Sequence, residues 1–170
     1  MKAIFKSDWF YQDKNIGSKI KSPIELFVGI SKSLKINLFD NYRSFFFLEK
    51  LLGQQLYKPP GVQGWSIGKA WISNSTLVFR LKLLAFLLNE EKSFMQAKSL
   101  PEEAKFKKDL NRFRKIRINF SPLKPIYRNS DKKKLGEYLL QTPVPLSQLS
   151  QVELKEVTKE IMGLPEYQLC

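Results

Sequence analysis

The chain contains no histidine and a single cysteine, Cys170, which is the last of its 170 residues. Without histidine, Ser-His-Asp and Cys-His nucleophile systems and the common histidine zinc sites are excluded within this chain. A lone terminal thiol cannot form an internal disulfide. We therefore assign no catalytic residue, metal site or cofactor from the sequence. An enzyme stays open through the sixteen carboxylates, although no two of them are placed by sequence as an acid/base pair.

Acidic residues are also scarce, and long apolar runs are missing. Sixteen Asp and Glu face 29 Lys and Arg, so the formal net charge is +13, which favours anionic glycans, phosphates or acidic surfaces as partners. The most apolar stretches, 34–52 and 77–88, are interrupted by charges, and we expect no transmembrane segment. Residues 1–11 are too short and too polar for a signal peptide.

What the chain does contain is helix-forming sequence with strong start signals. Ser22 and Glu25 form a capping box around Pro23, and Ser99 and Glu102 form a second one. Capping is a sufficient role for Glu25, which we prefer to a catalytic one. We expect helices over residues 1–11, 23–34, 41–52, 75–89, 100–116 and 131–141, and a last one from about 147 or 150 to 162, with no convincing strand pair. Asp40 is the expected cap of the helix over 41–52, and Asn74 or Ser75 that of the helix over 75–89. The predicted fold is all-α, an irregular bundle of about six helices.

A long ordered loop, residues 53–74, interrupts these helices. Its prolines and glycines exclude a regular helix or central strand, and its large aromatic side chains are Tyr57, Trp65 and Trp71. In one interpretation these aromatics pack back onto the helices as a structural plug. In the other they form a platform that stacks on sugar rings, and the candidate ligand residues are Trp65, Trp71, Tyr57, Gln54, Lys21 and Arg80.

The chain is long enough for one domain, residues 1–170. We expect a core within residues 1–90, C-terminal helices within 130–169, and a basic helical insert over about 92–129. Basic residues interleaved with aromatics in and after this insert could bind nucleic acid or an anionic surface. No DNA- or RNA-binding fold signature accompanies them, so nucleic acid is not favoured.

Several segments resemble one bacterial family, the domain-of-unknown-function family 1800. The matching pieces are Ile20 to Leu26, Gly53 to Tyr57, Pro59-Pro60, Val62, Gly64-Trp65, Gly68, Ala70 to Ile72, Thr76-Leu77, Arg80-Leu81 and, at the end, Leu164 to Gln168. The chain departs from the family in Gln55, where proline is usual, and in Ile67, where glycine is usual.

The resemblance implies a fragment, because family members are several times longer and often carry export signals. This chain would then be the C-terminal helical domain of an exported, periplasmic protein, with a structural or interaction role and no catalysis of its own. Its partners would be the missing N-terminal part or a sulfatase-like neighbour protein. The alternatives are a component of a carbohydrate-related enzyme or glycan-binding module, and a basic module for nucleic acid or anionic surfaces.

Overall fold

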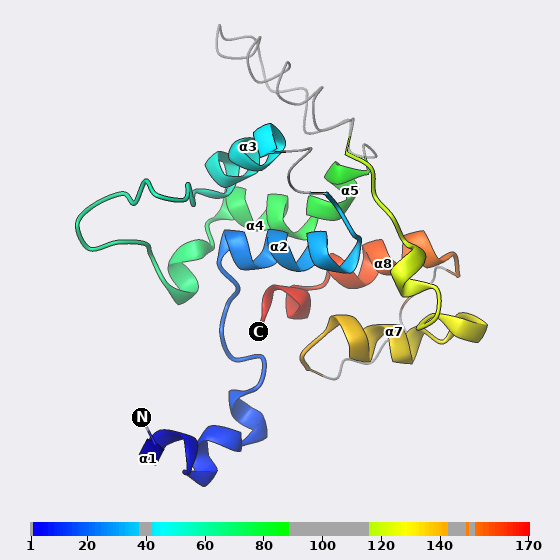
Figure 1. The fold of residues 1–170 in the computed structure, drawn as a ribbon, viewed down its shortest axis with the longest axis horizontal. Helices are drawn as coiled ribbons and strands as arrows, with labels where there is room; N and C mark the ends of the chain where they lie inside the picture. Colours follow the sequence, from blue (N-terminus) through cyan, green and yellow to red (C-terminus); the bar gives the residue numbers. More distant parts are fainter. Residues whose placement is uncertain (1, 38–41, 89–115, 143–148, 150–151) are drawn as a thin grey trace, which may run out of the picture.

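Helix α2 belongs to a helical body, from which the N-terminal segment with α1 extends (Figure 1). The computed structural model describes residues 2–37, 42–88, 116–142, 149 and 152–170. The helices are α1 (Lys2–Phe5), α2 (Pro23–Ser33), α3 (Tyr42–Leu52), α4 (Asn74–Leu81), α5 (Leu83–Leu87), α7 (Lys132–Leu139) and α8 (Leu154–Met162). Short 3-10 turns are η1 (Asp8–Tyr11), η2 (Asp13–Asn15), η3 (Gly68–Trp71), η5 (Ser121–Leu123), η6 (Arg128–Ser130) and η8 (Pro165–Gln168).

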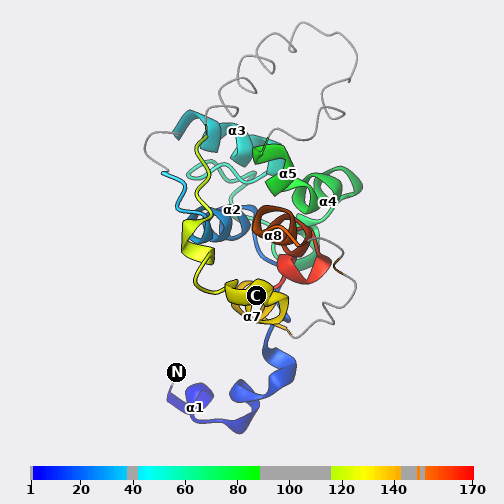
Figure 2. The ribbon, with the colours of Figure 1, turned by 90° about the vertical axis from the view of Figure 1, so that its right-hand side faces the viewer.

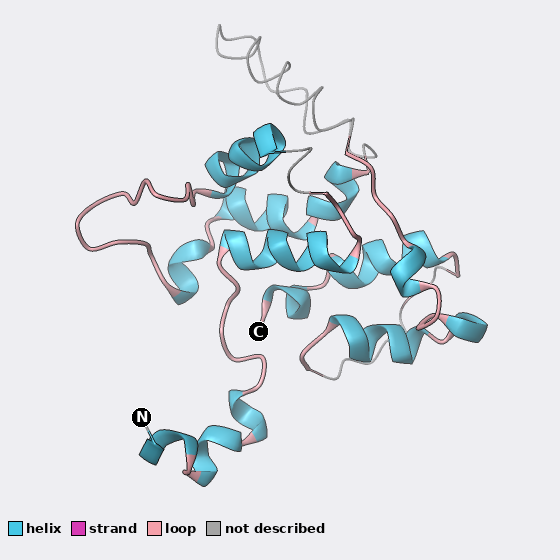
Figure 3. Ribbon diagram, in the orientation of Figure 1, coloured by secondary structure: helices cyan, strands magenta, loops and turns pink. Residues whose placement is uncertain are grey.

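The fold is all-α, which confirms the prediction from sequence; the described residues contain no strand (Figure 3). An isolated antiparallel bridge joins Ile20 to Leu169. Around it, Lys21 N donates to Gln168 O at 2.8 Å, and Cys170 N donates to Lys19 O at 2.8 Å. The C-terminal residues are thereby fixed beside the segment that leads into α2.

The core forms because α2 presents one apolar face. Leu26, Phe27, Ile30 and Leu34 are all buried, and a spacing of about four residues places them along one side of a helix. The ring of Phe27 lies 4.1 Å from that of Phe45 on α3. The other helices contribute further buried side chains: Phe47, Leu48, Leu52, Phe79, Leu83, Leu84, Phe86, Leu87, Leu135, Leu139, Val157, Ile161 and Met162. Figure 2 shows α2, α4, α5 and α8 gathered on this core.

The single helix expected over residues 75–89 is wrong in two respects. It is split into α4 and α5 at Lys82, where φ is −96° and ψ is 7°. Its cap is Ser73 rather than Asn74 or Ser75, because Ser73 Oγ accepts from Thr76 N at 3.3 Å and Thr76 Oγ1 accepts from Ser73 N at 2.8 Å. One straight helix would spread its apolar residues around the whole circumference, whereas the break lets each half bury its own face.

Other expectations meet the limits of the described residues. The predicted cap Asp40, the box of Ser99 and Glu102, and most of the basic insert lie outside them. Helix α7 begins after Asp131, whose carboxylate accepts from Lys134 N at 3.1 Å. Helix α8 begins only at Leu154. The earlier start expected for it falls partly on residues that are not described.

The helix expected over residues 1–11 is also wrong: only α1 is α-helical, and η1 and η2 follow it. Its apolar spacing suggested an inward face, yet none of the residues in these three elements is buried. Figure 1 shows this segment extending away from the helical body. Its aromatic rings instead pack on one another, with Phe5 and Phe10 edge to face at 5.1 Å.

Gly17 connects this N-terminal segment to the helical body, and a substitution at Gly17 tests how closely the chain packs there. Its φ is +66°, and a Cβ at this position would lie 2.5 Å from Thr142 Cγ2. We expect Gly17→Ala to lower the free energy of unfolding by about 1–2 kcal/mol in urea denaturation, because alanine resists this backbone conformation. Gly61→Ala is the control, since nothing lies within 4 Å of its added Cβ. Equal stabilities of the two variants would contradict this.

Candidate functional site

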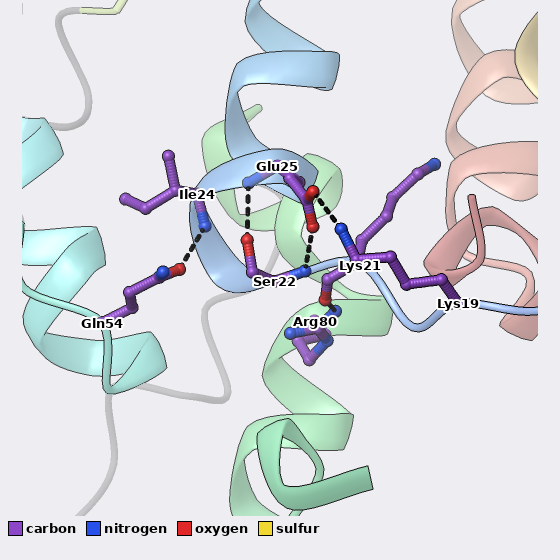
Figure 4. A network of polar contacts seen from close by, with 7 residues as sticks. All are labelled: Lys19, Lys21, Ser22, Ile24, Glu25, Gln54 and Arg80. Atoms are coloured by element: carbon purple, nitrogen blue, oxygen red, sulfur yellow. Dashed lines mark hydrogen bonds and ion pairs between the residues drawn. The ribbon is translucent and has the colours of Figure 1, made fainter. Parts of the chain in front are cut away.

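The N-terminus of α2 is the centre of a polar network (Figure 4). Ser22 Oγ accepts from Glu25 N at 3.3 Å, and Glu25 Oε2 accepts from Ser22 N at 2.7 Å, which completes a capping box. Gln54 Oε1 accepts from Ile24 N at 3.0 Å. Pro23 has no amide hydrogen, and the other backbone amides at this helix end all donate to protein acceptors. The helix end therefore has no free amide in its first turn to offer a ligand.

Glu25 also pairs with Lys19. The hydrogen bond from Lys19, followed by those from Ser22, holds the pKa of the Glu25 carboxyl below its usual value. An anionic carboxylate at the positive end of a helix is electrostatically favourable. Capping and ion pairing thus account for Glu25, and among the described residues no second carboxylate hydrogen-bonds with it.

The position of Gln54 follows from the end of α3. Gly53 adopts a φ of +80°, and Gln54 N donates to Glu49 O at 2.8 Å, so the chain turns out of the helix as the glycine predicts. The buried Glu49 carboxylate accepts from Leu56 N at 3.4 Å. Burial raises the pKa of Glu49. These contacts place the start of the loop next to α2.

Arg80 of α4 is the largest fully buried side chain, at 1% exposure. Its Nη2 donates to Lys21 O at 2.6 Å, and its Nε donates to Gln168 Oε1 at 3.1 Å. Burial lowers the pKa of Arg80. Its Nη1 and the Nε2 of Gln168 have no hydrogen-bond partner within the described residues, and no carboxylate of those residues pairs with the guanidinium. Arg80 therefore joins α4, the start of α2 and η8 through neutral acceptors.

Lys21 completes the network on the side of the C-terminus. Its Nζ donates to Tyr167 O at 2.7 Å and lies 4.2 Å from the centre of the Tyr167 ring. Burial lowers the pKa of Lys21 and raises that of Tyr167. The ammonium group is thus held between a carbonyl and an aromatic face, which is a favourable site for a half-buried cation.

The six ligand candidates from the sequence therefore separate into two groups. Lys21, Gln54 and Arg80 come together at the start of α2, where they hold structural elements. Trp65 and Trp71 pack on one another, with ring centres 6.4 Å apart, but Trp71 is buried. Tyr57 is completely exposed. The packing interpretation of the loop thus suits Trp71 and does not suit Tyr57.

Residues 53–71, the projecting loop, extend from the helical body between α3 and α4 and end in η3 (Figure 1). The three most exposed large hydrophobic side chains of the described residues are Tyr57 at 100%, Val62 at 109% and Ile67 at 84%, all in this loop. Lys58 and Lys69 are its only charged residues. Reasoning from sequence used Val62 and Ile67 only in the family comparison and did not predict their exposure, because neither residue suggests chemistry by itself.

Metal and membrane-spanning features are not found in the part of the chain that the structure describes. No group of three Cys, Asp or Glu residues there could hold a metal ion. No helix there has the length and hydrophobicity needed to cross a bilayer.

These features define an all-α protein with an exposed loop that projects from the helical body. The contacts of Arg80 with Lys21 and Gln168, here called the polar joint, connect α4 to the start of α2 and to η8. The family model described as "Protein of unknown function (DUF1800)" matches residues 1–169, and the chain belongs to this family. Neither curated proteins nor solved structures gave a match.

The joint at Arg80 can be tested by a double-mutant cycle. Arg80→Met leaves Gln168 Oε1 and Lys21 O buried without donors, and should lower the free energy of unfolding by about 2 kcal/mol. Adding Gln168→Leu removes one stranded acceptor, so the double variant should be about 1 kcal/mol more stable than additivity predicts. Arg117→Met, at an exposed arginine, is the control. If the two substitutions changed the free energy of unfolding in urea additively, Arg80 and Gln168 would not be coupled, which would contradict their assignment to one network.

The Glu25 charge should appear in the pH dependence of stability. Because its pKa is depressed in the folded state, its stabilisation is present above its usual value of 4.5 and is lost as pH falls through the folded pKa. Glu25→Gln keeps a capping acceptor but should weaken the acid destabilisation seen in unfolding curves between pH 6 and pH 2. Glu137→Gln, which removes a carboxylate on α7, is the control. If Glu25→Gln lost stability with falling pH as steeply as the unchanged chain does, the stabilising role of the Glu25 charge would be contradicted.

Proposed function

We propose that this chain is a binding domain without catalysis of its own, and that the projecting loop is its contact surface. The observation that carries the proposal is the exposure of Tyr57, Val62 and Ile67 on one loop. Clustered apolar side chains on a protein surface are typical of interaction sites, whereas scattered single ones are not. The helical body, with its core and polar joint, serves as the support.

The loop is held at both of its ends, which suits a contact element. At its start, Gln54 binds the first turn of α2 and Glu49 contacts Leu56 N. At its end, Trp71 is buried and its carbonyl accepts from Thr76 Oγ1 at 3.3 Å. A loop fixed at its base loses less conformational entropy on binding than a free segment.

Glycan binding is a second candidate, which the Trp65–Trp71 pair favours because aromatic rings can stack on sugars. Burial of Trp71 leaves only the half-buried Trp65 and the exposed Tyr57 for such stacking. Three further expectations rest on the family resemblance alone. They are export, a role beside the rest of a longer family protein or a sulfatase-like neighbour, and a part in a carbohydrate-related enzyme.

The test compares three anionic probes: dextran sulfate, an oligothymidylate and vesicles that contain phosphatidylglycerol. We expect the chain to bind at least one of them, and Val62→Ser/Ile67→Ser to bind that probe at least about tenfold more weakly, because apolar contact area is lost. Val152→Ser is the matched control, since Val152 is 64% exposed outside the loop. Binding that is unaffected by the loop substitutions, or no binding to any probe, would overturn the proposal.

A further inference from the structure

We infer that the projecting loop inserts its exposed apolar side chains into the interface of an anionic lipid bilayer; this inference rests on the proposed function and names its partner class. Among the large hydrophobic side chains of the described residues, two of the three most exposed, Val62 and Ile67, are aliphatic. Aliphatic groups offer a glycan or a nucleic acid apolar contact area, but no aromatic stacking face and no hydrogen bond. Their transfer from water into the region of the acyl chains is favourable, and a fluid bilayer can accept them without a preformed binding pocket.

The charges of the loop complement such a surface. Lys58 follows Tyr57 directly, and Lys69 lies two residues after Ile67; both lysines are exposed. Residues 50–88 contain no Asp or Glu, so no carboxylate of this segment would be driven against anionic headgroups. Tyr57 adds an aromatic ring with a polar end, the kind of side chain that is enriched at membrane interfaces.

The backbone of the loop is suited to shallow burial. Pro59 and Pro60 have no amide donor to desolvate. Lys58 N donates to Gln55 O at 3.0 Å, and Gly64 N donates to Gly61 O at 3.0 Å, so turns within the loop satisfy further donors. Irregular backbone is excluded from the hydrocarbon centre of a bilayer. The loop would therefore lie at the level of the headgroups with only its side chains in the apolar layer.

The experiment measures sedimentation of the full chain with vesicles of phosphatidylcholine, with and without phosphatidylglycerol. We expect binding only when phosphatidylglycerol is present. Val62→Ser/Ile67→Ser should weaken it at least about tenfold, and Lys58→Gln and Lys69→Gln about fivefold each. Val152→Ser should bind as the unchanged chain does. No binding to the anionic vesicles, or equal binding by Val62→Ser/Ile67→Ser, would overturn the inference.

Insertion is measured directly with a dye sensitive to polarity. Val62→Cys in a Cys170→Ser background carries the dye in the loop, and Val152→Cys in the same background carries it elsewhere. With anionic vesicles, emission from position 62 should rise and be quenched by brominated acyl chains, while that from position 152 should not change. Equal responses at both positions would contradict insertion. If Val62→Ser/Ile67→Ser instead loses dextran sulfate or oligothymidylate binding and no vesicle binding exists, the proposed function stands and the bilayer is excluded.

Discussion

The arrangement of helices depends on the buried guanidinium of Arg80. It reaches a carbonyl at Lys21 and an amide oxygen at Gln168, two positions 147 residues apart in the chain. Arginine suits this position because its planar fork presents several donors in fixed directions at once. Because both acceptors are neutral, the charge is solvated by dipoles rather than by an ion pair, and the loss of either acceptor would expose the desolvation cost. Arg80 thus ties both η8 and the segment before α2 to α4, in addition to the backbone hydrogen bonds that join those two segments to each other.

This dependence changes the meaning of the basic residues at the start of α2. A helix N-terminus beside Lys19, Lys21 and Arg80 has the charge of an anion site. However, Ser22, Glu25 and Gln54 already occupy the first-turn amides, and Lys21 is held by Tyr167. The cluster therefore acts as a joint between elements. The only members of the six ligand candidates with exposed or half-exposed aromatic surface are Tyr57 and Trp65, both on the projecting loop.

The difference between what sequence could and could not predict follows from distance along the chain. The capping pair Ser22 and Glu25 is separated by three residues, so local spacing is enough to find it. Gly53 as the end of α3 is an equally local signal. Arg80 and Gln168 are 88 residues apart in the chain, and no local pattern around either residue predicts that the two are in contact. The irregularity of residues 53–71 was evident from their prolines and glycines, but their outward direction depends on tertiary packing that composition does not encode.

Tyr57 shows most clearly that the fold does not explain the loop. Its φ is +62°, a conformation that glycine adopts freely and that costs another residue about 1–2 kcal/mol. Its side chain is completely exposed, so no packing within the described residues offsets that cost. Gly64 and Gly68 adopt similar values in the same loop without this penalty. A glycine would therefore serve the fold better at position 57. Under the proposed function, a partner bound at the projecting loop would cover this ring and supply the contacts that the described residues do not.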